Sequence, residues 1–402
     1  MFQKVKNIYH LFQAAIANIW YGFPSRRLKV IGVTGTDGKT TTTHLIAHIL
    51  KENGKKVSFI SSVYASIANK EYDIGFHVTT PSSFAIQKYI KRAADAGDEY
   101  FVLETTSHAL DQNRVWGIHY IIGVVTNVTH EHLDYHGTYE NYVRTKARLL
   151  RASALGIINS KDKSFDYFST MAGLKYKTYD DNLKKLNNIE GATEFNLYNF
   201  AAAYTVCLAL GLRSEKILGA ILSFKLPKGR LEIVYDKEFK VIIDFAHTPN
   251  AFSKLLPEIK ETYQLKGRLI HVFGAAALRD VSKRPLMGQA AGRYDDIVVL
   301  TEEDYRTEDP LKICDDLAVG LAKEGFSKVN YDELANTKGK EYAVIVNREK
   351  AVREAIKFAR KGDIVVLTGK SHEKSLCRGK TEYPYSEHEA VKKATKNKYL
   401  YI

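Results

Sequence analysis

The residues best suited to chemistry in this sequence form a short glycine-containing segment between an apolar run and a helical pattern. The segment consists of Gly35, Thr36, Asp37, Gly38, Lys39, Thr40 and Thr41. Glycines let backbone N–H groups approach phosphate oxygens, and the start of a helix adds partial positive charge. Lys39 can reach the β and γ phosphates of a nucleotide, and the Thr40 hydroxyl can bind Mg²⁺. The segment therefore predicts a nucleoside triphosphate site, although Val33 stands where the strict phosphate-loop pattern requires glycine.

Other ionisable side chains come at or just after the ends of apolar runs. Glu104 ends the run 100–104, and Glu131, His132 and Asp134 follow the run 121–127. The carboxyl ends of parallel strands meet at one edge of a sheet, so we expect these groups to lie near the phosphate segment. The Glu104 carboxylate is a ligand of the kind that Mg²⁺ prefers. For His132 an ordinary hydrogen-bonding role is the alternative, because Mg²⁺ prefers oxygen ligands.

Two series of alternating strand and helix patterns must position these residues. In the first series, strands are predicted at 28–34, 57–61, 100–104, 121–127 and 156–159, with helices at 40–51, 84–96 and 139–151. In the second, strands are predicted at 241–246, 269–273, 296–301, 342–346 and 363–368, with a helix at 351–360. Strands separated by helices indicate parallel sheets. The sequence therefore predicts two α/β domains, 30–229 and 230–402.

Residues 1–29 form a basic arm with a helical apolar pattern. The arm contains Lys4, Lys6, Arg26, Arg27 and Lys29 and no acidic residue. Apolar side chains recur at helical spacing, namely Val5, Ile8, Phe12, Ile16 and Ile19, followed by Trp20 and Phe23. Polar residues interrupt the run, so it does not predict a membrane span. One interpretation is docking on a membrane surface or a partner protein; the other, which we favour, is packing on the protein's own core.

The overall composition is that of a globular protein. The 402 residues are 45% hydrophobic and 26% charged, which excludes a mainly disordered, collagen-like or membrane-spanning chain. Three scattered cysteines are too few for a disulfide framework, so we expect a reducing cytoplasm. The net charge of +13 fits nucleic acid, an anionic membrane, or a basic surface with pockets for a polyanionic small substrate. We favour the last and expect no nucleic-acid partner, because no nucleic-acid-binding module is recognisable.

Several motifs in order along the chain resemble those of the Mur ligase family, most closely the MurE branch of UDP-N-acetylmuramoyl-tripeptide synthetases. In the first domain they are VTGTDGKTTTT at 33–43, ETTSHALDQNR at 104–114, TNVTHEHLDYHG at 126–137, YVRTKARLL at 142–150 and FNLYNFAAA at 195–203. In the second they are GRLE at 229–232, DFAHTPN at 244–250, RDVSKRPLMG at 279–288, TEEDYRTEDP at 301–310 and GKSHE at 369–373.

This resemblance implies a central P-loop parallel-sheet ATPase domain, a C-terminal Rossmann-like α/β domain, and an ATP-dependent amide ligase. ATP and Mg²⁺ would activate a carboxylate as an acyl phosphate, which an amino acid of the diaminopimelate or lysine type then attacks. The acceptor would be a muramoyl-peptide-like cell-wall precursor. Two alternatives stay open: a ligase that elongates a different acceptor, such as a poly-amino acid or a folate, and a nucleotide-binding partner protein without catalysis.

The resemblance also implies roles for individual residues. Catalysis would use Lys39, Glu104, His132 and Lys146, and the metal ligands would be Thr40, Glu104, His132 and Lys146, the last as a carbamate. Further nucleotide contacts would be Asn199, Arg230, Asp244 and His247. The acceptor would contact Thr79, Thr80, Thr106, Gln112 and Arg114. The incoming amino acid would contact Arg279, Glu303, Asp304, Arg306, Gly369 and Glu373.

Four of these residues have a structural alternative. Lys146 could be an ordinary surface lysine, and Arg114 could form a surface salt bridge. Asn199 could cap a helix, and Asp244 could stabilise a turn.

The sequence departs from the family pattern in four places. Family members carry a uridine-binding domain ahead of the phosphate loop, where only the basic arm stands here. We therefore expect a lipid-linked or otherwise shortened acceptor, or a partner protein that supplies this domain. Such an acceptor would place the protein in the cytoplasm, at the inner face of the membrane. The other departures surround the incoming amino acid: Tyr305 replaces a proline, the stretch 274–278 reads GAAAL, and Ser371 replaces a glycine.

Overall fold

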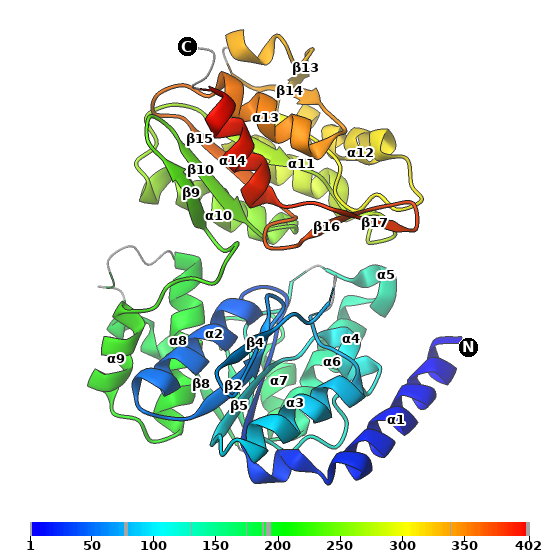
Figure 1. Ribbon diagram of the computed structural model, residues 1–402, viewed down its shortest axis with the longest axis vertical. Helices are drawn as coiled ribbons and strands as arrows, with labels where there is room; N and C mark the ends of the chain where they lie inside the picture. The colour runs from blue at the N-terminus through cyan, green and yellow to red at the C-terminus, as the bar shows by residue number, and fades with distance from the viewer. Residues whose placement is uncertain are drawn as a thin grey trace. The chain divides into compact units, whose positions relative to one another are not determined.

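The computed structural model describes residues 2–75, 79–129, 131–173, 175–186, 189, 194–337 and 339–398. It contains two compact units, Met1–Pro227 and Lys228–Ile402, and the basic arm belongs to the first. Each unit is built on a mainly parallel sheet covered by helices (Figure 1). The predicted α/β class is thus confirmed.

The first unit has an eight-stranded sheet in the order β4-β3-β2-β5-β1-β6-β7-β8. Its strands are β1 (Lys29–Thr34), β2 (Val57–Ile60), β3 (Ala65–Ile67), β4 (Lys70–Tyr72), β5 (Tyr100–Glu104), β6 (Tyr120–Val125), β7 (Ser153–Ile158) and β8 (Tyr176–Thr178). The six strands β2, β5, β1, β6, β7 and β8 run parallel to their neighbours in this row. β1 lies between β5 and β6, so the loops that follow these three strands meet at one edge of the sheet.

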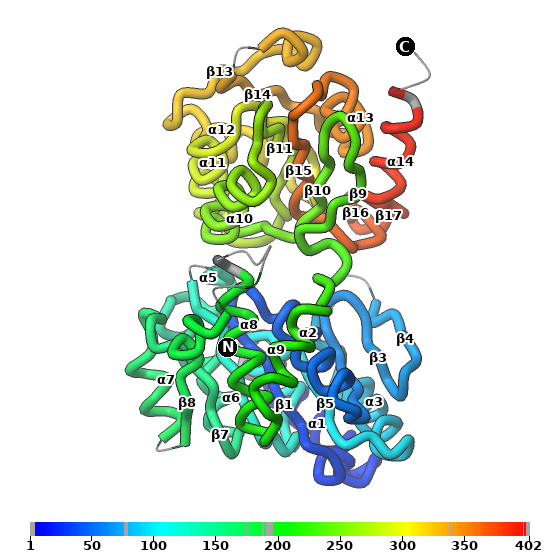
Figure 2. The backbone as a smooth tube through the Cα atoms, turned by 90° about the vertical axis from the view of Figure 1, so that its left-hand side faces the viewer, coloured from blue at the N-terminus to red at the C-terminus, as the bar shows by residue number. Residues whose placement is uncertain are grey.

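Helices cover both faces of this sheet. On one face α2 (Lys39–Glu52), α8 (Glu194–Ala209) and α9 (Ser214–Leu222) pack together over a buried apolar cluster. On the other face lie α3 (Ser83–Asp95), α4 (Ser107–Asp111), α6 (Tyr139–Arg151) and α7 (Phe165–Ala172). Shorter elements are η1 (Pro24–Arg27), α5 (Leu133–His136) and η2 (Asp180–Lys185). The backbone trace in Figure 2 shows α8 and α9 beside α2.

The second unit has a seven-stranded sheet in the order β13-β14-β12-β11-β15-β10-β9. The strands are β9 (Glu232–Asp236), β10 (Lys240–Asp244), β11 (Leu269–Phe273), β12 (Ile297–Leu300), β13 (Ser327–Lys328), β14 (Glu341–Val344) and β15 (Ile364–Thr368). Only the edge strand β9 pairs antiparallel. Two apolar clusters cover the two faces of this seven-stranded sheet. One involves α10 (Pro249–Thr262), α11 (Lys283–Tyr294) and α12 (Pro310–Lys323), and the other α13 (Arg348–Phe358) and α14 (Glu387–Lys398). A hairpin of β16 (Ser375–Arg378) and β17 (Thr381–Pro384), and the turn η3 (Leu334–Asn336), complete the unit.

The predicted central strands and helices are confirmed, several of them to the residue. β5, β11 and α6 coincide with the predicted segments 100–104, 269–273 and 139–151. The sequence analysis missed the short strands β3, β4, β8, β9, β13, β16 and β17. Most of these lie at sheet edges or in the hairpin and are only partly buried, so they lack the continuous apolar run that marks a buried parallel strand.

The arm forms a 20-residue helix, α1 (Phe2–Tyr21), as its periodicity predicts. It packs on its own unit, but through a face of small residues: Ala14, Ala17 and Asn18 are fully buried. Phe12 and Ile16 are 64% and 53% exposed. The favoured interpretation, packing on the protein's own core, is therefore confirmed for the helix, but its large apolar side chains lie on the other face. No described helix is long and apolar enough to cross a membrane.

Candidate active site

The phosphate segment forms a tight loop between β1 and α2. Gly35 and Gly38 have φ angles of +151° and +80°. A Cβ atom at Gly35 would lie 1.8 Å from Thr126 Oγ1, and one at Gly38 would lie 2.1 Å from Asn199 Oδ1. Side chains at either position would collide with these groups, so the backbone path requires glycine.

The loop following β6 holds the phosphate segment in place. Thr36 N–H donates to the backbone oxygen of Asn127 at 2.8 Å, and Asp37 N–H donates to Asn127 Oδ1 at 3.0 Å. Thr126 Oγ1 donates to the backbone oxygen of Asp37 at 2.6 Å. Lys39 Nζ donates to Thr36 O at 2.8 Å, which keeps the ammonium beside the loop. The segment is therefore pre-organised before any ligand arrives.

A set of oxygen ligands lies at the start of α2. Thr40 Oγ1 donates to Glu104 Oε1 at 3.1 Å and lies 2.9 Å from Ser62 Oγ. Ser62 N–H donates to the other carboxylate oxygen, Glu104 Oε2, at 2.8 Å. Glu104 is 1% exposed. A buried carboxylate with two hydroxyl oxygens suits Mg²⁺, so Thr40 and Glu104 fit the predicted metal site.

Lys146 reaches the same loop from α6. Its side chain is 1% exposed, and Nζ donates to the backbone oxygen of Gly35 at 2.6 Å. Nζ also lies 4.4 Å from the ring centre of Tyr142, and within the described part of the chain it has no carboxylate partner. Burial, together with the nearby charge of Lys39, holds the pKa of Lys146 well below its usual value. The alternative of an ordinary surface lysine is wrong for this residue.

His132 stands next to this group in an aromatic cluster. It has φ +56° at the start of α5 (Leu133–His136), and its ring centre lies 4.9 Å from that of His108 and 6.1 Å from that of Tyr142. The Tyr142 ring thus borders both His132 and Lys146. Burial lowers the pKa of the neighbouring His136 to about 4, so this imidazole is neutral at physiological pH.

The predicted acceptor residues gather beside Glu104. Thr80 Oγ1 donates to the backbone oxygen of Glu104 at 3.0 Å, and Thr106 N–H donates to Thr80 Oγ1 at 3.0 Å. Arg114 donates to the backbone oxygen of Thr80, and burial lowers its pKa. The described contacts of Arg114 are hydrogen bonds to backbone oxygens, which differ from the surface salt bridge of the alternative interpretation. Thr79 is half-buried at the preceding position.

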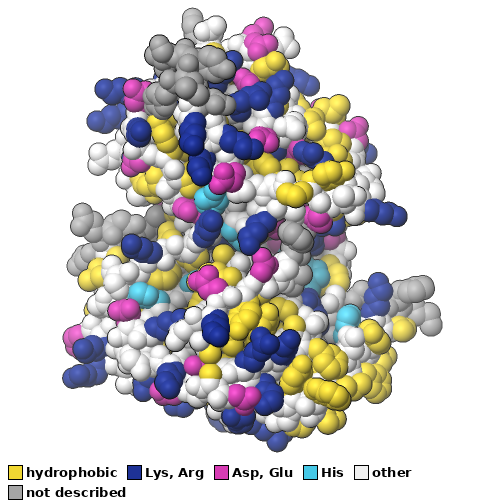
Figure 3. Space-filling view, viewed as in Figure 1, with side chains coloured by type: hydrophobic (Ala, Val, Ile, Leu, Met, Phe, Trp, Pro, Cys, Tyr) yellow, Lys and Arg dark blue, Asp and Glu magenta, His cyan; other side chains and the backbone are white. Residues whose placement is uncertain are grey.

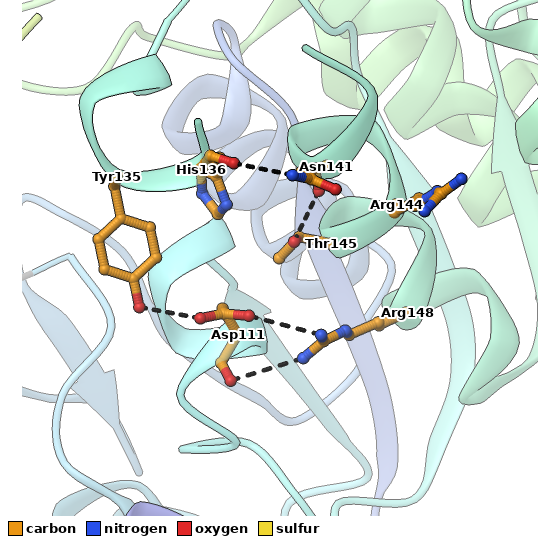
Figure 4. Close-up of a pocket in the computed structure, with 7 residues that line it drawn as sticks. All are labelled: Asp111, Tyr135, His136, Asn141, Arg144, Thr145 and Arg148. Carbon is orange, nitrogen blue, oxygen red and sulfur yellow. Dashed lines mark hydrogen bonds and ion pairs between the residues drawn. The ribbon is translucent and has the colours of Figure 1, made fainter. Parts of the chain in front are cut away.

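A cavity of about 360 Å³ lies between α4 and α6, close to the acceptor residues. Figure 4 shows its lining of Asp111, Tyr135, His136, Asn141, Arg144, Thr145 and Arg148. Gln112 Nε2 donates to Tyr135 OH at 3.4 Å, and Tyr135 OH donates to Asp111 Oδ2 at 3.0 Å. Gln112 is therefore tied to the wall of this cavity.

Two further predicted nucleotide residues lie on helices around the loop. Thr41 is buried in the first turn of α2. Asn199 lies inside α8, not at its end, so the helix-cap alternative is wrong. Its Oδ1 accepts from Thr42 Oγ1 at 3.3 Å, and it faces Gly38.

In the second unit, the predicted nucleotide residues surround Phe245. The Arg230 guanidinium lies 4.6 Å from the centre of the Phe245 ring, and the His247 ring centre lies 4.9 Å away. Asp244 instead stabilises the backbone: its two oxygens accept from the N–H groups of Leu231 at 2.8 Å and Ala246 at 2.7 Å. These contacts fit the turn-forming alternative for Asp244, and its predicted nucleotide contact stays a prediction.

The predicted amino-acid residues cluster around a lysine that the sequence analysis did not single out. Lys370 is fully buried, and its Nζ lies 2.9 Å and 3.1 Å from the two oxygens of Asp304 and 2.5 Å from Glu373 Oε2. Burial lowers the pKa of Lys370, but Glu373 and Asp304 outweigh burial and raise it above its usual value. Asp304 Oδ1 also accepts from the Cys377 N–H at 2.9 Å.

Glu303 differs from its neighbour Asp304. It is 8% exposed, and its Oε2 has no hydrogen-bond partner among the described residues. Burial, with the charge of Asp304, raises the pKa of Glu303 to about 6. A Cβ at Gly369 would lie 2.7 Å from Glu303 Oε2, so glycine there leaves room for the carboxylate.

The structure does not bring the two predicted arginines into this cluster. Arg279 is exposed. Arg306 lies at φ +47° and pairs through its backbone with the β16 hairpin, where its N–H donates to Cys377 O at 3.1 Å. Ser371, also at positive φ, donates through Oγ to Gly229 O at 2.6 Å.

Sequence reasoning missed three residues of these sites: Ser62, Tyr142 and Lys370. Ser62 follows β2 at the same sheet edge as Glu104, so the strand-end rule could have found it. Tyr142 lies one helical turn before Lys146, and Lys370 lies inside a quoted motif. No periodicity marks these residues, because their role depends on contacts between distant segments.

Comparison with known proteins identifies the family to which the chain belongs. The Mur ligase middle domain model matches residues 33–201, and the Mur ligase glutamate ligase domain model matches residues 229–371. A UDP-N-acetylmuramyl-tripeptide synthetase of Borrelia garinii is 37% identical over 417 residues, which is 95% of this chain and 79% of the relative. The chain belongs to the Mur ligase family. The resemblance found in the sequence is therefore confirmed.

Other relatives of this Mur ligase carry names of the same branch. The UDP-N-acetylmuramoyl-L-alanyl-D-glutamate–2,6-diaminopimelate ligases of Aquifex aeolicus and Geobacillus kaustophilus are 36% and 34% identical, over 94% and 96% of this chain and 79% and 82% of the relative. This Mur ligase is an ATP-dependent ligase, which confirms the predicted enzyme class and favours it over the partner protein without catalysis.

Solved structures agree on the fold. A structure of a diaminopimelate ligase of the same name aligns with a TM-score of 0.57 at 26% identity, covering 92% of this chain and 79% of that one. The folylpolyglutamate synthase/dihydrofolate synthase of Yersinia pestis, complexed with AMPPNP and Mn ion, aligns with a TM-score of 0.70 at 18% identity, covering 98% and 93%. The second likeness shows the fold alone, so the folate alternative gains no support.

Proposed function

We propose that this Mur ligase uses ATP to join an amino acid to a carboxylate of a muramoyl-peptide acceptor. The observation that carries the proposal is the convergence of Lys39, Thr40, Glu104 and Lys146 on one glycine loop. Phosphoryl transfer to a carboxylate depends almost entirely on positioning and on stabilisation of charge, and this loop supplies both.

In the first step an acceptor carboxylate oxygen attacks the γ-phosphorus of ATP, and the bond to ADP breaks. The N–H groups of the loop and Lys39 would hold the phosphates while charge spreads over the transferring group. Thr40 and Glu104 would hold a Mg²⁺ ion, which screens that charge when it is bound.

In the second step the amine of the incoming amino acid attacks the acyl carbon. The carbon–oxygen bond to phosphate breaks, an amide forms, and the amine loses its proton. A free carboxylate is a poor acyl donor, so the preceding phosphorylation supplies the leaving group. Product release then yields ADP and phosphate in equal amounts.

Lys146 is proposed to act as a carbamate. Carbamate formation needs a neutral amine, which attacks CO₂ and releases one proton. The lowered pKa of Lys146 favours the neutral amine, and no carboxylate pairs with it among the described residues. A carbamate would replace this buried cation by an anion beside the metal ligands. His132, across the Tyr142 ring, would complete the site.

The acceptor is proposed to lie along Thr80, Thr106 and Arg114, with Thr79 and Gln112 beside them. Arg114 keeps guanidinium N–H groups beyond those that bind Thr80 O and Pro81 O. A guanidinium pairs well with a carboxylate of the acceptor peptide. Free cysteines and the need for ATP fit a cytoplasmic reaction.

For the incoming amino acid we propose a diaminopimelate-type substrate. The second unit offers the Glu303 carboxylate for a distal ammonium, whereas Arg306 and Arg279, proposed for a distal carboxylate, lie outside the Glu303 cluster. The names of the relatives from Aquifex and Geobacillus support this choice over lysine. Nucleotide contacts from this unit would come from Arg230 and His247, with Asp244 holding their turn.

The test is ADP release measured with acceptor and amino acid supplied separately and together, with the product mass read directly. We expect turnover only with both, fastest with diaminopimelate. Acceptors with and without the UDP group should be compared in the same assay. ADP release that needs neither substrate, or an amino acid joined to a folate, would contradict the proposal.

A further inference from the structure

The outward face of α1 is a continuous apolar stripe. Seven large side chains on this helix are 53–75% exposed: Val5, Ile8, Tyr9, Phe12, Ile16, Ile19 and Trp20. Their spacing of three and four residues places them on one side of the helix, over a length of about 22 Å. In Figure 3 hydrophobic side chains gather over this helix. A stripe of this size on a folded protein marks an interaction surface.

The opposite face fixes the helix to the first unit. Asn18 Nδ2 donates to the backbone oxygen of Trp116 at 2.8 Å, and Asn7 Nδ2 donates to Asp111 Oδ2 at 2.9 Å. Ala14 and Ala17 are fully buried and allow close approach. Because these contacts hold α1 along its length, the stripe cannot turn inward without losing them.

The positive charge near the apolar stripe indicates which kind of partner binds it. The chain contains no acidic residue before Asp37, and Lys6, Arg26 and Lys29 are exposed, as is Arg27, which pairs with Asp95 at 2.8 Å. A helix with an apolar face and basic flanks binds the interface of membranes that contain anionic lipids. A second copy of the same helix would instead place like charges together.

We propose that α1 docks this ligase on the surface of an anionic lipid bilayer. The helix lies in the interface plane, with Phe12, Ile16 and Trp20 among the acyl chains and the basic residues at the headgroups. The docking also fixes the acceptor segment, since α1 contacts residues 111–117 through Asn7 and Asn18. Lipid docking does not depend on the proposed reaction and is tested by binding alone.

The experiment is flotation of the full chain with vesicles of phosphatidylcholine, alone or with phosphatidylglycerol. We expect flotation with the anionic vesicles, reduced by salt. The variant F12Q/I16Q/W20Q should bind at least about tenfold more weakly, because it removes apolar surface from the interface. As a matched control, L222Q/L311Q/V319Q removes side chains that are 69%, 53% and 50% exposed elsewhere, and it should float like the unmodified chain.

Fluorescence provides an independent readout. The chain has two tryptophans, so W116F leaves Trp20 as the single reporter. Its emission should shift to the blue on anionic vesicles and be quenched by brominated lipid. Flotation that F12Q/I16Q/W20Q retains, equal binding to neutral vesicles, or no flotation at all would overturn the proposal. So would a dimer that F12Q/I16Q/W20Q abolishes in the absence of lipid binding.

Discussion

Lys146 in the first unit and Lys370 in the second are both almost completely buried, and the two lysines have opposite surroundings. Lys146 touches a backbone oxygen and an aromatic ring, and its pKa is lowered by burial and by Lys39. Lys370 lies between Asp304 and Glu373, and its pKa is raised despite burial. Lys146 therefore loses its proton more easily than an ordinary lysine, and Lys370 holds its proton more tightly.

This difference separates a reactive group from a structural one. Burial without an anionic partner disfavours the charged form of an amine. The neutral amine, which can react as a nucleophile, is therefore more populated. A buried ion pair with satisfied hydrogen bonds instead holds its segments together, and removing one partner leaves uncompensated charge. Substitutions at the two lysines and at their neighbours test this contrast.

The largest effect is expected from Lys146→Met, which keeps the side-chain length but removes the amine. Turnover should fall at least about a thousandfold, because the group that supports the metal ligands is lost. Added bicarbonate should not restore it. The measurement is steady-state ADP release, with exposed Lys163→Met as the matched control.

The melting temperature of the Lys146→Met protein should stay close to that of the unmodified chain. Turnover within a fewfold of that of the unmodified enzyme would contradict the carbamate role of Lys146. The contrast between Lys146 and Lys370 would then be lost.

Lys370→Met should act on stability. The substitution leaves the buried Asp304 and the half-buried Glu373 without their cation, so we expect a loss of about 3 kcal/mol in the free energy of unfolding. Urea unfolding of the two proteins measures this. Lys55→Met, which breaks an exposed pair of 3.5 Å with Glu99, should cost less than about 0.5 kcal/mol. Equal losses for both variants would contradict a structural role for Lys370.

Glu303 predicts a pH dependence. Its folded pKa of about 6 lies above the usual 4.5, so the folded protein binds the proton more tightly than the unfolded chain. Stability should therefore fall as pH rises from 4.5 to 6, by up to about 2 kcal/mol.

Glu303→Gln should remove this slope and be more stable than the unmodified chain at pH 7.5, but not below pH 4.5. Urea unfolding across this range checks it, with exposed Glu261→Gln as the control. Parallel stability profiles for the unmodified chain and Glu303→Gln would refute the prediction.

The smallest effect is expected at the loop itself. Gly38→Ala places a Cβ 2.1 Å from Asn199 Oδ1 and should weaken ATP binding about tenfold, equivalent to 1.4 kcal/mol. Gly54→Ala has a similar φ, +73°, but nothing within 4 Å of the new Cβ. It should leave ATP affinity unchanged. Calorimetric titration with ATP measures the affinity of both variants. Equal affinities for Gly38→Ala and Gly54→Ala would mean that the loop tolerates a Cβ atom at position 38.

Much of the architecture was predictable from local patterns. The apolar runs of β5 and β11 and the amphipathic pattern of α6 are strong enough to set their ends to the residue. The glycine loop and Glu104 were predictable because parallel strands end at one edge. The contacts of Lys146 with Gly35, 111 residues away, were not, because no local signal connects two segments that meet only in the folded sheet.

By itself, the sequence determined the two α/β units, the phosphate loop and the family, because periodicity and glycine placement report local backbone geometry. Only the tertiary structure decided which way α1 faces. Its spacing shows that Phe12 and Ile16 share a side, but close packing through Ala14 and Ala17 buries the opposite one. Among the described residues the fold likewise left Lys146 without a carboxylate in ion-pair contact and placed Lys370 between two, since the charge state of a buried amine depends on neighbours that only folding supplies.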